Sequence, residues 1–322
     1  MTDVVQSANT PIHPKVSVCV ITYNQEEYIR QCLDSLVSQT PNFAFEIVVG
    51  DDCSTDRTRD IVEEFVARYP LLVRTNFQPR NTGGSRNNLE VHAIARGDYV
   101  AHMDGDDYAL PGKLQAQADA LDGDIGCNAV WHPVDFFDDK GGFCSGTTAD
   151  LSSFKDGLVR FEDSIRTGYI SVFSSLMYRR SARIVPDPSR NMLDLYFTWD
   201  LLSNGYGRVL PIVLGRYRVS STGSLQAASL RRVELLALDH ASEFLTRFPQ
   251  HRSDFLIWAL TAGVVAAKSR RRVALDYFRF SWHMRTWVWP SAITSNIHRV
   301  RQARVKWRDK RTIAPASLLQ SS

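Results

Sequence analysis

Three aspartates that follow a short apolar run are the residues of this sequence best suited to chemistry. The run Tyr99–Met103 leads directly into Asp104, Gly105, Asp106 and Asp107. Carboxylate oxygens are the ligands that hard divalent cations such as Mg²⁺ or Mn²⁺ prefer, and such a cation commonly holds a diphosphate in place. A simple polar turn would carry the same residues. The other segments of the chain must therefore decide between a turn and a metal site.

Two earlier apolar runs end in polar residues in the same way. Val16–Thr22 is β-branched and leads into a Tyr-Asn pair, and Phe45–Gly50 leads into an Asp-Asp pair. Such runs are typical of strands buried on both faces of a parallel sheet. Ligands of open α/β sheets bind outside the carboxyl ends of the strands, so we expect the three polar clusters to meet at one edge.

Helical patterns separate these strands. Apolar residues recur at helical spacing after Asn24, which together with Glu27 predicts a capping box. They recur again after a loop in which Ser54 or Asp56 is expected to cap the next helix. With a third strand near 71–76, this alternation predicts an α/β fold with a mixed, mainly parallel sheet flanked by helices.

The pattern changes beyond residue 125. One strand is predicted over Asn128–Phe137, a loop and strand over Tyr169–Tyr178, a helix over Leu193–Leu202, and an edge strand over Arg208–Val219, which Pro211 interrupts. From residue 225 the periodicity is only helical, over about 225–248, 254–267, 271–286 and 293–308. The predicted parts are a flexible N-terminus at 1–15, an α/β domain at 16–224 and a helical, basic region at 225–322.

The composition is that of an ordinary globular protein. Of the 322 residues, 44% are hydrophobic and 23% are charged. No run approaches the roughly eighteen apolar residues that a membrane span needs, and no signal peptide is evident. The five cysteines form no C-x-x-C pair, which favours reduced thiols and a cytoplasmic location.

Three ordered motifs resemble the inverting glycosyltransferases of family 2, which have the GT-A fold. The motifs are V-S-V-C-V-I-T-Y-N, V-V-G-D-D-C-S-T-D and D-G-D-D, and the resemblance spans residues 16–220. It implies transfer of a sugar from a nucleotide-diphosphate donor, commonly a UDP-sugar, to a hydroxyl of a glycan, lipid-linked or protein acceptor. It also implies Mg²⁺ or Mn²⁺ as cofactor. The polymerising synthases carry Gln-x-x-Arg-Trp after the base, and its absence here favours a single, non-processive transfer.

The resemblance also implies roles for residues of the donor site. Asp52 hydrogen-bonds the base, Arg86 is the cation near the base or phosphates, Asp104 contacts the ribose and Asp106 binds the metal. The metal neutralises charge on the departing nucleoside diphosphate. The residues expected to pack against the nucleotide base are Ile21, Thr22, Tyr23 and Asn24.

The acceptor side needs a general base that takes the proton of the attacking hydroxyl. The resemblance implies an acid on the helix predicted near 193–202. Asp200, at the end of Tyr196–Asp200, lies at the matching place and is the predicted base. Its aromatic neighbours would help to raise its pKa by partial desolvation, and Asp194 is the competing acid. Ser174 and Ser175 resemble the acceptor-side loop of the family.

Departures from the family pattern leave alternatives open. Tyr217-Arg218-Val219 is followed by Ser220, where many relatives carry a histidine that completes the metal or phosphate site. Either the metal is bound more weakly, or Arg218 and Ser220–Ser224 hold the diphosphate. A catalytically degenerate carbohydrate- or partner-binding protein is therefore the alternative function. A dinucleotide-binding dehydrogenase is disfavoured, because no G-x-G-x-x-G follows the first strand.

The C-terminal region concentrates positive charge. The whole chain carries a net charge of +3, yet Lys268–Arg311 alone contains thirteen basic residues and two acidic ones, interleaved with tryptophans. Aromatic and basic residues together favour peripheral contact with an anionic membrane, here the cytoplasmic face of the inner membrane. Packing on the catalytic domain and a homodimer contact are the alternatives. No nucleic-acid-binding motif accompanies the charge.

Overall fold

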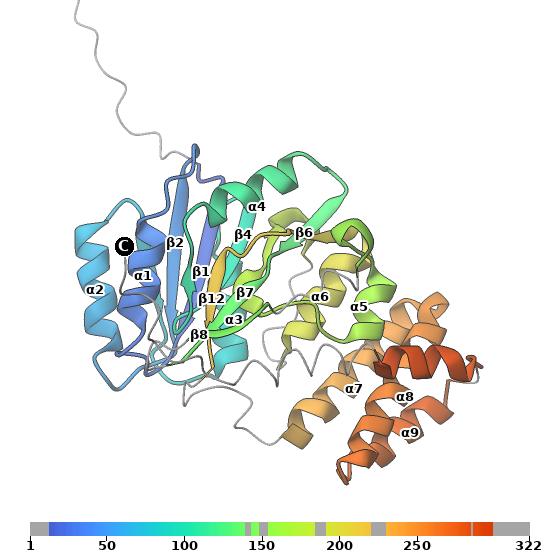
Figure 1. Ribbon diagram of the computed structural model, residues 1–322. Helices are drawn as coiled ribbons and strands as arrows, with labels where there is room; N and C mark the ends of the chain where they lie inside the picture. Colours follow the sequence, from blue (N-terminus) through green and yellow to red (C-terminus); the bar gives the residue numbers. More distant parts are fainter. Residues whose placement is uncertain are drawn as a thin grey trace, which may run out of the picture.

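A large mixed sheet forms the centre of the computed structural model, which describes residues 13–138, 143–147, 154–183, 191–219, 230–284 and 286–298 (Figure 1). The strand order is β3-β2-β1-β4-β10-β6-β11-β9. These strands are β1 (Val16–Thr22), β2 (Phe45–Asp51), β3 (Val73–Phe77), β4 (Tyr99–Asp104), β6 (Cys127–Trp131), β9 (Leu158–Val159), β10 (Met177–Arg179) and β11 (Tyr206–Val209).

The first half of this sheet is parallel, as predicted. β1 pairs in parallel with β2 and β4, and β2 with β3. The connecting helices are α1 (Ile29–Val37), α2 (Thr58–Arg68) and α3 (Gly84–Ala93). Successive residues of β1 belong to different cores: Val18 and Val20 face one apolar cluster, and Cys19 faces the other. Burial on both faces explains the nearly continuous apolar runs.

The second half of the sheet contains two reversed strands, β10 and the edge strand β9, which pairs antiparallel with β11. β10 pairs antiparallel with both β4 and β6, and β6 pairs in parallel with β11. β6 and β11 therefore run in the direction of β4. The carboxyl ends of β1, β2, β4, β6 and β11 all lie at one edge of the sheet.

A second sheet accounts for two errors in the predicted strands. It consists of β5 (Tyr108–Ala109), β7 (Val134–Phe137), β8 (Phe143–Thr147) and β12 (Gly215–Arg218), in the order β5-β12-β7-β8. The strands predicted over 128–137 and 208–219 are each divided between the two sheets. Pro133 and Pro211 fall in the gaps, since proline lacks the N–H that a continuous ladder needs. β12 lies between two strands, so the predicted edge position is wrong.

Some local predictions also need correction. Asn24 does not cap α1; it has a positive φ of 50°, and the helix begins only at Ile29. Asp56 does cap the start of α2, because its Oδ1 accepts a hydrogen bond from Thr58 N at 3.0 Å. The segment predicted as a loop and strand over 169–178 contains a 3₁₀ turn at Phe173–Ser175, after which β10 begins at Met177.

Further helices cover the sheet and extend beyond it. They are α4 (Lys113–Asp122), α5 (Phe161–Thr167), α6 (Asp194–Ser203), α7 (Leu230–Arg247), α8 (Arg252–Lys268) and α9 (Ala274–Trp282), and residues 290–298 are also helical. Figure 1 shows α7, α8 and α9 grouped beside α5 and α6, at the opposite end of the molecule from α1 and α2. The part of the predicted last helix after residue 298 lies outside the described residues.

The C-terminal helices share a core with the sheet helices. Trp199 of α6 makes edge-to-face contacts with Phe244 of α7 and with Phe255 and Trp258 of α8, at centroid distances of 5.3–5.8 Å. One buried cluster continues from α5 and α6 to Met284. Within the described ranges, none of the helices combines the length and the apolar character that a membrane span requires.

Candidate active site

Strand register brings the three predicted polar clusters together. Ile21 of β1 lies opposite both Gly50 of β2 and Asp104 of β4, and Thr22 lies opposite Asp51. The three strands therefore end at the same level. Gly105 lets the acidic loop approach the turn after β1, because a Cβ there would lie 2.5 Å from Gln25 Oε1.

Ser174 joins two acids of this cluster. Its Oγ donates to Asp107 Oδ2 at 2.5 Å and accepts from the backbone N of Asp104 at 3.0 Å. Lys113 Nζ donates to the carbonyl oxygen of Ser174, also at 2.5 Å. Ser175 is fully buried, and its Oγ donates to Val172 O. Both serines are turned into the protein, so the geometry does not support their predicted place on the acceptor side.

The acid cluster gathers three carboxylates beside two buried cations, Lys113 and Arg218. Asp107 is buried, and this burial, together with the charges of Asp106 and Asp104, raises the pKa of its carboxyl well above the usual range. Burial lowers the pKa of Lys113 to about 8 against the opposing effect of Asp107. Like charges held this close favour the arrival of a cation or the uptake of a proton.

Asp104 and Asp106 could bind a hard divalent cation, because both offer carboxylate oxygens and both are accessible from solvent. Both are partly exposed at the strand end, whereas Asp107 is enclosed. Mg²⁺ typically takes one or two carboxylates, and substrate phosphates and water complete its shell. Among the residues that the structure describes, no group of three or more His, Cys, Asp or Glu forms a complete metal site. The missing ligands would therefore come from the diphosphate and from water.

His102 and His92, which the sequence did not single out, form a chain of hydrogen bonds that ends at Asp104. His102 Nε2 lies 3.1 Å from Asp104 Oδ1, and His102 Nδ1 lies 2.9 Å from His92 Nε2. His92 Nδ1 lies 2.9 Å from the hydroxyl of Tyr178. Burial keeps the pKa of His92 well below its usual value, so this ring is neutral. The consistent proton arrangement has Tyr178 donating to His92, His92 to His102, and His102 to Asp104.

Asp52 holds the loop before α3 rather than standing free. Its Oδ1 accepts from Thr82 N at 2.7 Å and its Oδ2 accepts from Gly83 N at 2.8 Å. A carboxylate has further lone pairs for an imide N–H, so the predicted contact with the base stays a prediction. Asp51 beside it is fully buried and pairs with Arg59 Nε at 2.5 Å.

The turn after β1 is tied to the loop after β2. Asn24 Oδ1 accepts from Thr55 N at 2.8 Å, and Asn24 N donates to Ser54 Oγ at 2.9 Å. Next to these bonds, Tyr23 is 44% exposed. An aromatic ring presented on a braced turn is suited to packing against a base, which agrees with its predicted role.

The two predicted arginines have different surroundings. Arg86 is half-exposed on α3, where its Nε pairs with Glu90 Oε1 at 2.8 Å. Arg218 is buried, and its guanidinium lies 4.2 Å from the ring centre of Tyr28 and 4.3 Å from that of Phe137. Its Nε donates to the backbone oxygen of Asp106. Arg218 therefore braces the acidic loop, and Ser220–Ser224 lie outside the described residues.

Asp200 lies between helices and not at the strand ends. It is 2% exposed, and its Oδ1 lies 3.4 Å from Arg247 Nη2 on α7. Its neighbour Trp199 is packed among aromatic rings of α7 and α8. A carboxylate enclosed and paired in this way cannot meet a sugar unless α6 and α7 separate. The structure therefore does not bring the predicted base to the acid cluster.

Asp194, the competing acid, does lie near the cluster. It is the first residue of α6 and is exposed. The surrounding protein and the charge of Asp104 raise its pKa to about 6. Tyr169 is close enough to both Asp194 and Asp107 for their charges to raise its pKa. Asp194 and Tyr169 thus both lie within electrostatic reach of the acid cluster.

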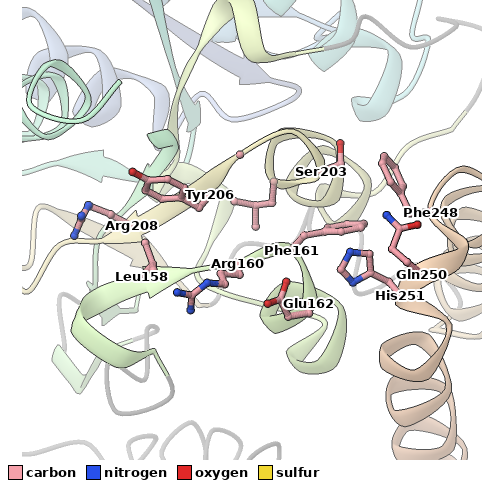
Figure 2. A pocket seen from close by; sticks show the side chains of 12 residues that line it. Leu158, Arg160, Phe161, Glu162, Ser203, Tyr206, Arg208, Phe248, Gln250 and His251 are labelled. Atoms are coloured by element: carbon pink, nitrogen blue, oxygen red, sulfur yellow. The ribbon is translucent and has the colours of Figure 1, made fainter. Parts of the chain in front are cut away.

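A separate cavity of about 590 Å³ lies at the other edge of the sheet (Figure 2). Figure 2 shows Tyr206 and Arg208 on one side and Phe248, Gln250 and His251 across from them. Tyr206 begins β11, which runs in the direction of β4, so this cavity adjoins the amino ends of the strands. It holds none of the predicted site residues.

Comparisons with known proteins agree with the architecture. The sequence model described as "Glycosyl transferase family 2" matches residues 17–183. An uncharacterised protein of Mycobacterium tuberculosis is 34% identical over 215 residues, which cover 66% of this chain and 61% of the relative. The chain thus spans about three fifths of the length of that relative.

Solved structures show the same fold. Staphylococcus aureus TarS in complex with UDP-GlcNAc matches with a TM-score of 0.63 and 21% identity, over 92% of this chain and 89% of TarS. A mannosyltransferase of Pyrobaculum calidifontis in complex with GDP-Man and Mn²⁺ matches with a TM-score of 0.56 and 17% identity, over 92% and 87% of the two chains. The predicted GT-A fold is confirmed.

Proposed function

The chain belongs to glycosyl transferase family 2, and from that premise we propose that it transfers one sugar from a UDP-sugar to a hydroxyl group, with inversion at the anomeric carbon. The observation that carries the proposal is the meeting of the ends of β1, β2 and β4 at one edge of the sheet, where the charge of Asp104 acts on Asp194 at the start of α6. The solved TarS complex with UDP-GlcNAc supports the choice of a UDP-sugar.

The donor binds along the strand ends in this proposal. Tyr23 packs on the base, Asp52 accepts a hydrogen bond from the base, and Asp104 contacts the ribose. Asp106, with Asp104, would hold a Mg²⁺ or Mn²⁺ ion, which supplies Lewis-acid stabilisation of the departing diphosphate. The mannosyltransferase complex with GDP-Man and Mn²⁺ supports a divalent cation. The bonds from Ser174 and His102 fix the position of Asp104 before the donor arrives.

Asp194 takes the role of general base in this proposal, in place of Asp200. The acceptor oxygen bonds to the anomeric carbon as the bond from that carbon to the diphosphate oxygen breaks. The acceptor proton passes to the carboxylate of Asp194. A pKa of about 6 suits this task, because the group is ionised at neutral pH and yet binds a proton better than an ordinary aspartate.

The acceptor is proposed as a hydroxyl of a glycan or of a lipid-linked saccharide. A stretch of 110 residues is 41% identical to TarS, whose name is poly(ribitol-phosphate) beta-N-acetylglucosaminyltransferase. These 110 residues make up only 19% of TarS, so they support a polyhydroxylated acceptor in general and no particular polymer. Unpaired cysteines at positions 19, 32, 53 and 127 agree with action on the cytoplasmic side.

The test is calorimetric titration with UDP, GDP and UDP-GlcNAc, each with Mn²⁺ and with EDTA. We expect UDP and UDP-GlcNAc to bind at least about tenfold more tightly than GDP, and more tightly with Mn²⁺, because the cation links carboxylate and phosphate oxygens. Absence of binding by every nucleoside diphosphate would refute the proposal. Tight UDP-GlcNAc binding with no transfer or hydrolysis would favour a catalytically degenerate binding protein.

A further inference from the structure

The outer side of α9 and the loop after it expose several large apolar side chains. We name this surface the tryptophan face; its members are Leu275, Phe278, Trp282, Trp287 and Trp289. The three tryptophans are 84%, 64% and 70% exposed. Apolar side chains gathered on an exposed surface in this way mark interaction sites.

The geometry of α9 shows that these side chains do not belong to its core-facing side. Ala274, Tyr277 and Ser281 are the buried residues of the helix. Leu275, Phe278 and Trp282 recur at spacings of three and four residues and so share one side, from its edge at Phe278, whose ring lies next to Gly263 of α8, to the exposed Trp282. A surface helix normally carries polar residues there.

Beyond α9, residues 286–289 carry two further exposed tryptophans that contact each other. The rings of Trp287 and Trp289 meet edge to face with centroids 4.5 Å apart. Between them, Val288 is partly buried against the core. Met284, only 2% exposed, fixes the start of the loop. The aromatic side chains are therefore held outward by a backbone that is anchored at two points.

The charge around the tryptophan face is almost entirely positive. Lys268, Arg270, Arg272 and Arg279 are exposed. Asp276 is the one acid between residues 268 and 284, and it lies 4.0 Å from Arg279. A partner that covers this surface must therefore accept both aromatic side chains and a rim of cations.

We propose that the tryptophan face docks on the surface of an anionic phospholipid bilayer. Tryptophan prefers the boundary between headgroups and acyl chains, where its ring is buried and its N–H stays hydrated. Lysine and arginine are attracted by the negative surface potential of anionic lipids. The side chains project from a helix and do not line a groove, as a shallow interfacial contact requires.

The position of the face permits such contact. Figure 1 shows α9 on the outer side of the group formed by α7 and α8, at the far end of the molecule from α2. A flat surface can thus meet α9 without displacing the helices packed on the parallel half of the sheet. The inference rests on α9 and its loop alone and does not depend on the proposed transfer reaction.

The test is co-sedimentation of the full chain with phosphatidylcholine vesicles, with and without 30% phosphatidylglycerol. The wild type is expected to bind the anionic vesicles at least about tenfold more tightly than the neutral ones. Substituting Trp282→Ser, Trp287→Ser and Trp289→Ser together should weaken this binding about tenfold or more, because it removes the apolar contact but leaves every charge. Replacing Arg272 and Arg279 with glutamate should reduce the preference for anionic lipid, because it reverses two charges beside the tryptophan face.

The matched control replaces two exposed apolar residues elsewhere. Leu71 and Ile125 are 100% and 89% exposed, and Leu71→Ser with Ile125→Ser should leave vesicle binding unchanged. Unchanged UDP binding and melting temperature in the tryptophan variant would show that it is folded. If that variant binds vesicles like the wild type, the proposal is wrong. A wild type that ignores vesicles but dimerises through these tryptophans would also overturn it, in favour of a second copy of the chain.

Discussion

Two carboxylates on α6 have opposite surroundings although they are six residues apart. Asp194 begins the helix and is exposed at its side chain; desolvation by the surrounding protein and then the charge of Asp104 raise its pKa to about 6. Asp200 is buried and pairs with Arg247 of α7. Six residues turn a helix by about 600° and advance it about 9 Å, so the two side chains point in different directions at different heights.

Position along α6 therefore decides the chemistry of its acids. Asp194 lies close enough to Asp104 to feel its charge, whereas Tyr196 and Trp199 of the same helix belong to the core shared with α7 and α8. Aromatic residues next to an acid in the sequence can therefore surround either a catalytic base or a buried ion pair. The aromatic residues around Asp200 enclose its ion pair with Arg247.

The largest expected effect concerns the acid cluster that Asp194 faces. Asp106→Ala should weaken UDP-sugar binding in Mn²⁺ about 100-fold, because the variant lacks a carboxylate that would hold the divalent cation. Calorimetry with and without Mn²⁺ measures the affinity. The control variant is Asp60→Ala, which removes an acid of α2. Equal affinities of variant and wild type in Mn²⁺ would exclude Asp106 as a ligand.

The next largest effect is the pH dependence of transfer, which tests whether Asp194 is the general base. Asp194 must be ionised to accept a proton, and its pKa is raised to about 6. We expect kcat/KM to fall as pH decreases through 6, about tenfold for each further unit. Rates measured from pH 4.5 to 8 with the same donor check this. A profile that stays flat down to pH 5 would contradict the assignment of Asp194.

The histidines below Asp104 should have a smaller effect. His102→Phe keeps an aromatic ring of similar volume but removes the N–H that bonds to Asp104. We expect the affinity for the UDP-sugar in Mn²⁺ to fall about tenfold. His102→Gln retains an N–H donor and should recover most of the affinity. If both variants bind the donor like the wild type, the hydrogen bond from His102 does not position Asp104.

The smallest effect on catalysis is expected at the other end of α6. Asp200→Ala leaves Arg247 without this partner and should lower the free energy of unfolding by about 2 kcal/mol. Transfer per folded molecule should stay within about threefold of the wild type. Urea unfolding and initial rates measure the two quantities. A stable variant that has lost transfer would reverse the roles of the two acids.

Local patterns sufficed to predict the donor half of the molecule. β1 has the predicted bounds, and the ends of β1, β2 and β4 meet as expected, because buried parallel strands and their end residues are signalled within a few positions. The division of two predicted strands between sheets was missed. Pro133 and Pro211 gave the only local signal, and it does not tell which sheet the chain joins next.

Contacts between distant segments could not be predicted. His92, His102 and Tyr178 come from α3, β4 and β10, so their chain of hydrogen bonds exists only in the folded sheet. A period of two places His102 on the same side of β4 as Asp104, and this spacing is the signal that could have found it. The choice between Asp194 and Asp200 likewise depended on α7, which begins 30 residues after Asp200.

The decisive measurement compares Asp194→Asn with Asp200→Asn in single-turnover transfer at saturating UDP-sugar. We expect Asp194→Asn to slow transfer by about 10³-fold with donor affinity nearly unchanged. It should remain at least as stable as the wild type above pH 6, because the raised pKa means that ionised Asp194 is disfavoured in the folded protein. Asp200→Asn should slow transfer less than about tenfold. The opposite ranking of the two variants would contradict the assignment of Asp194 as the general base.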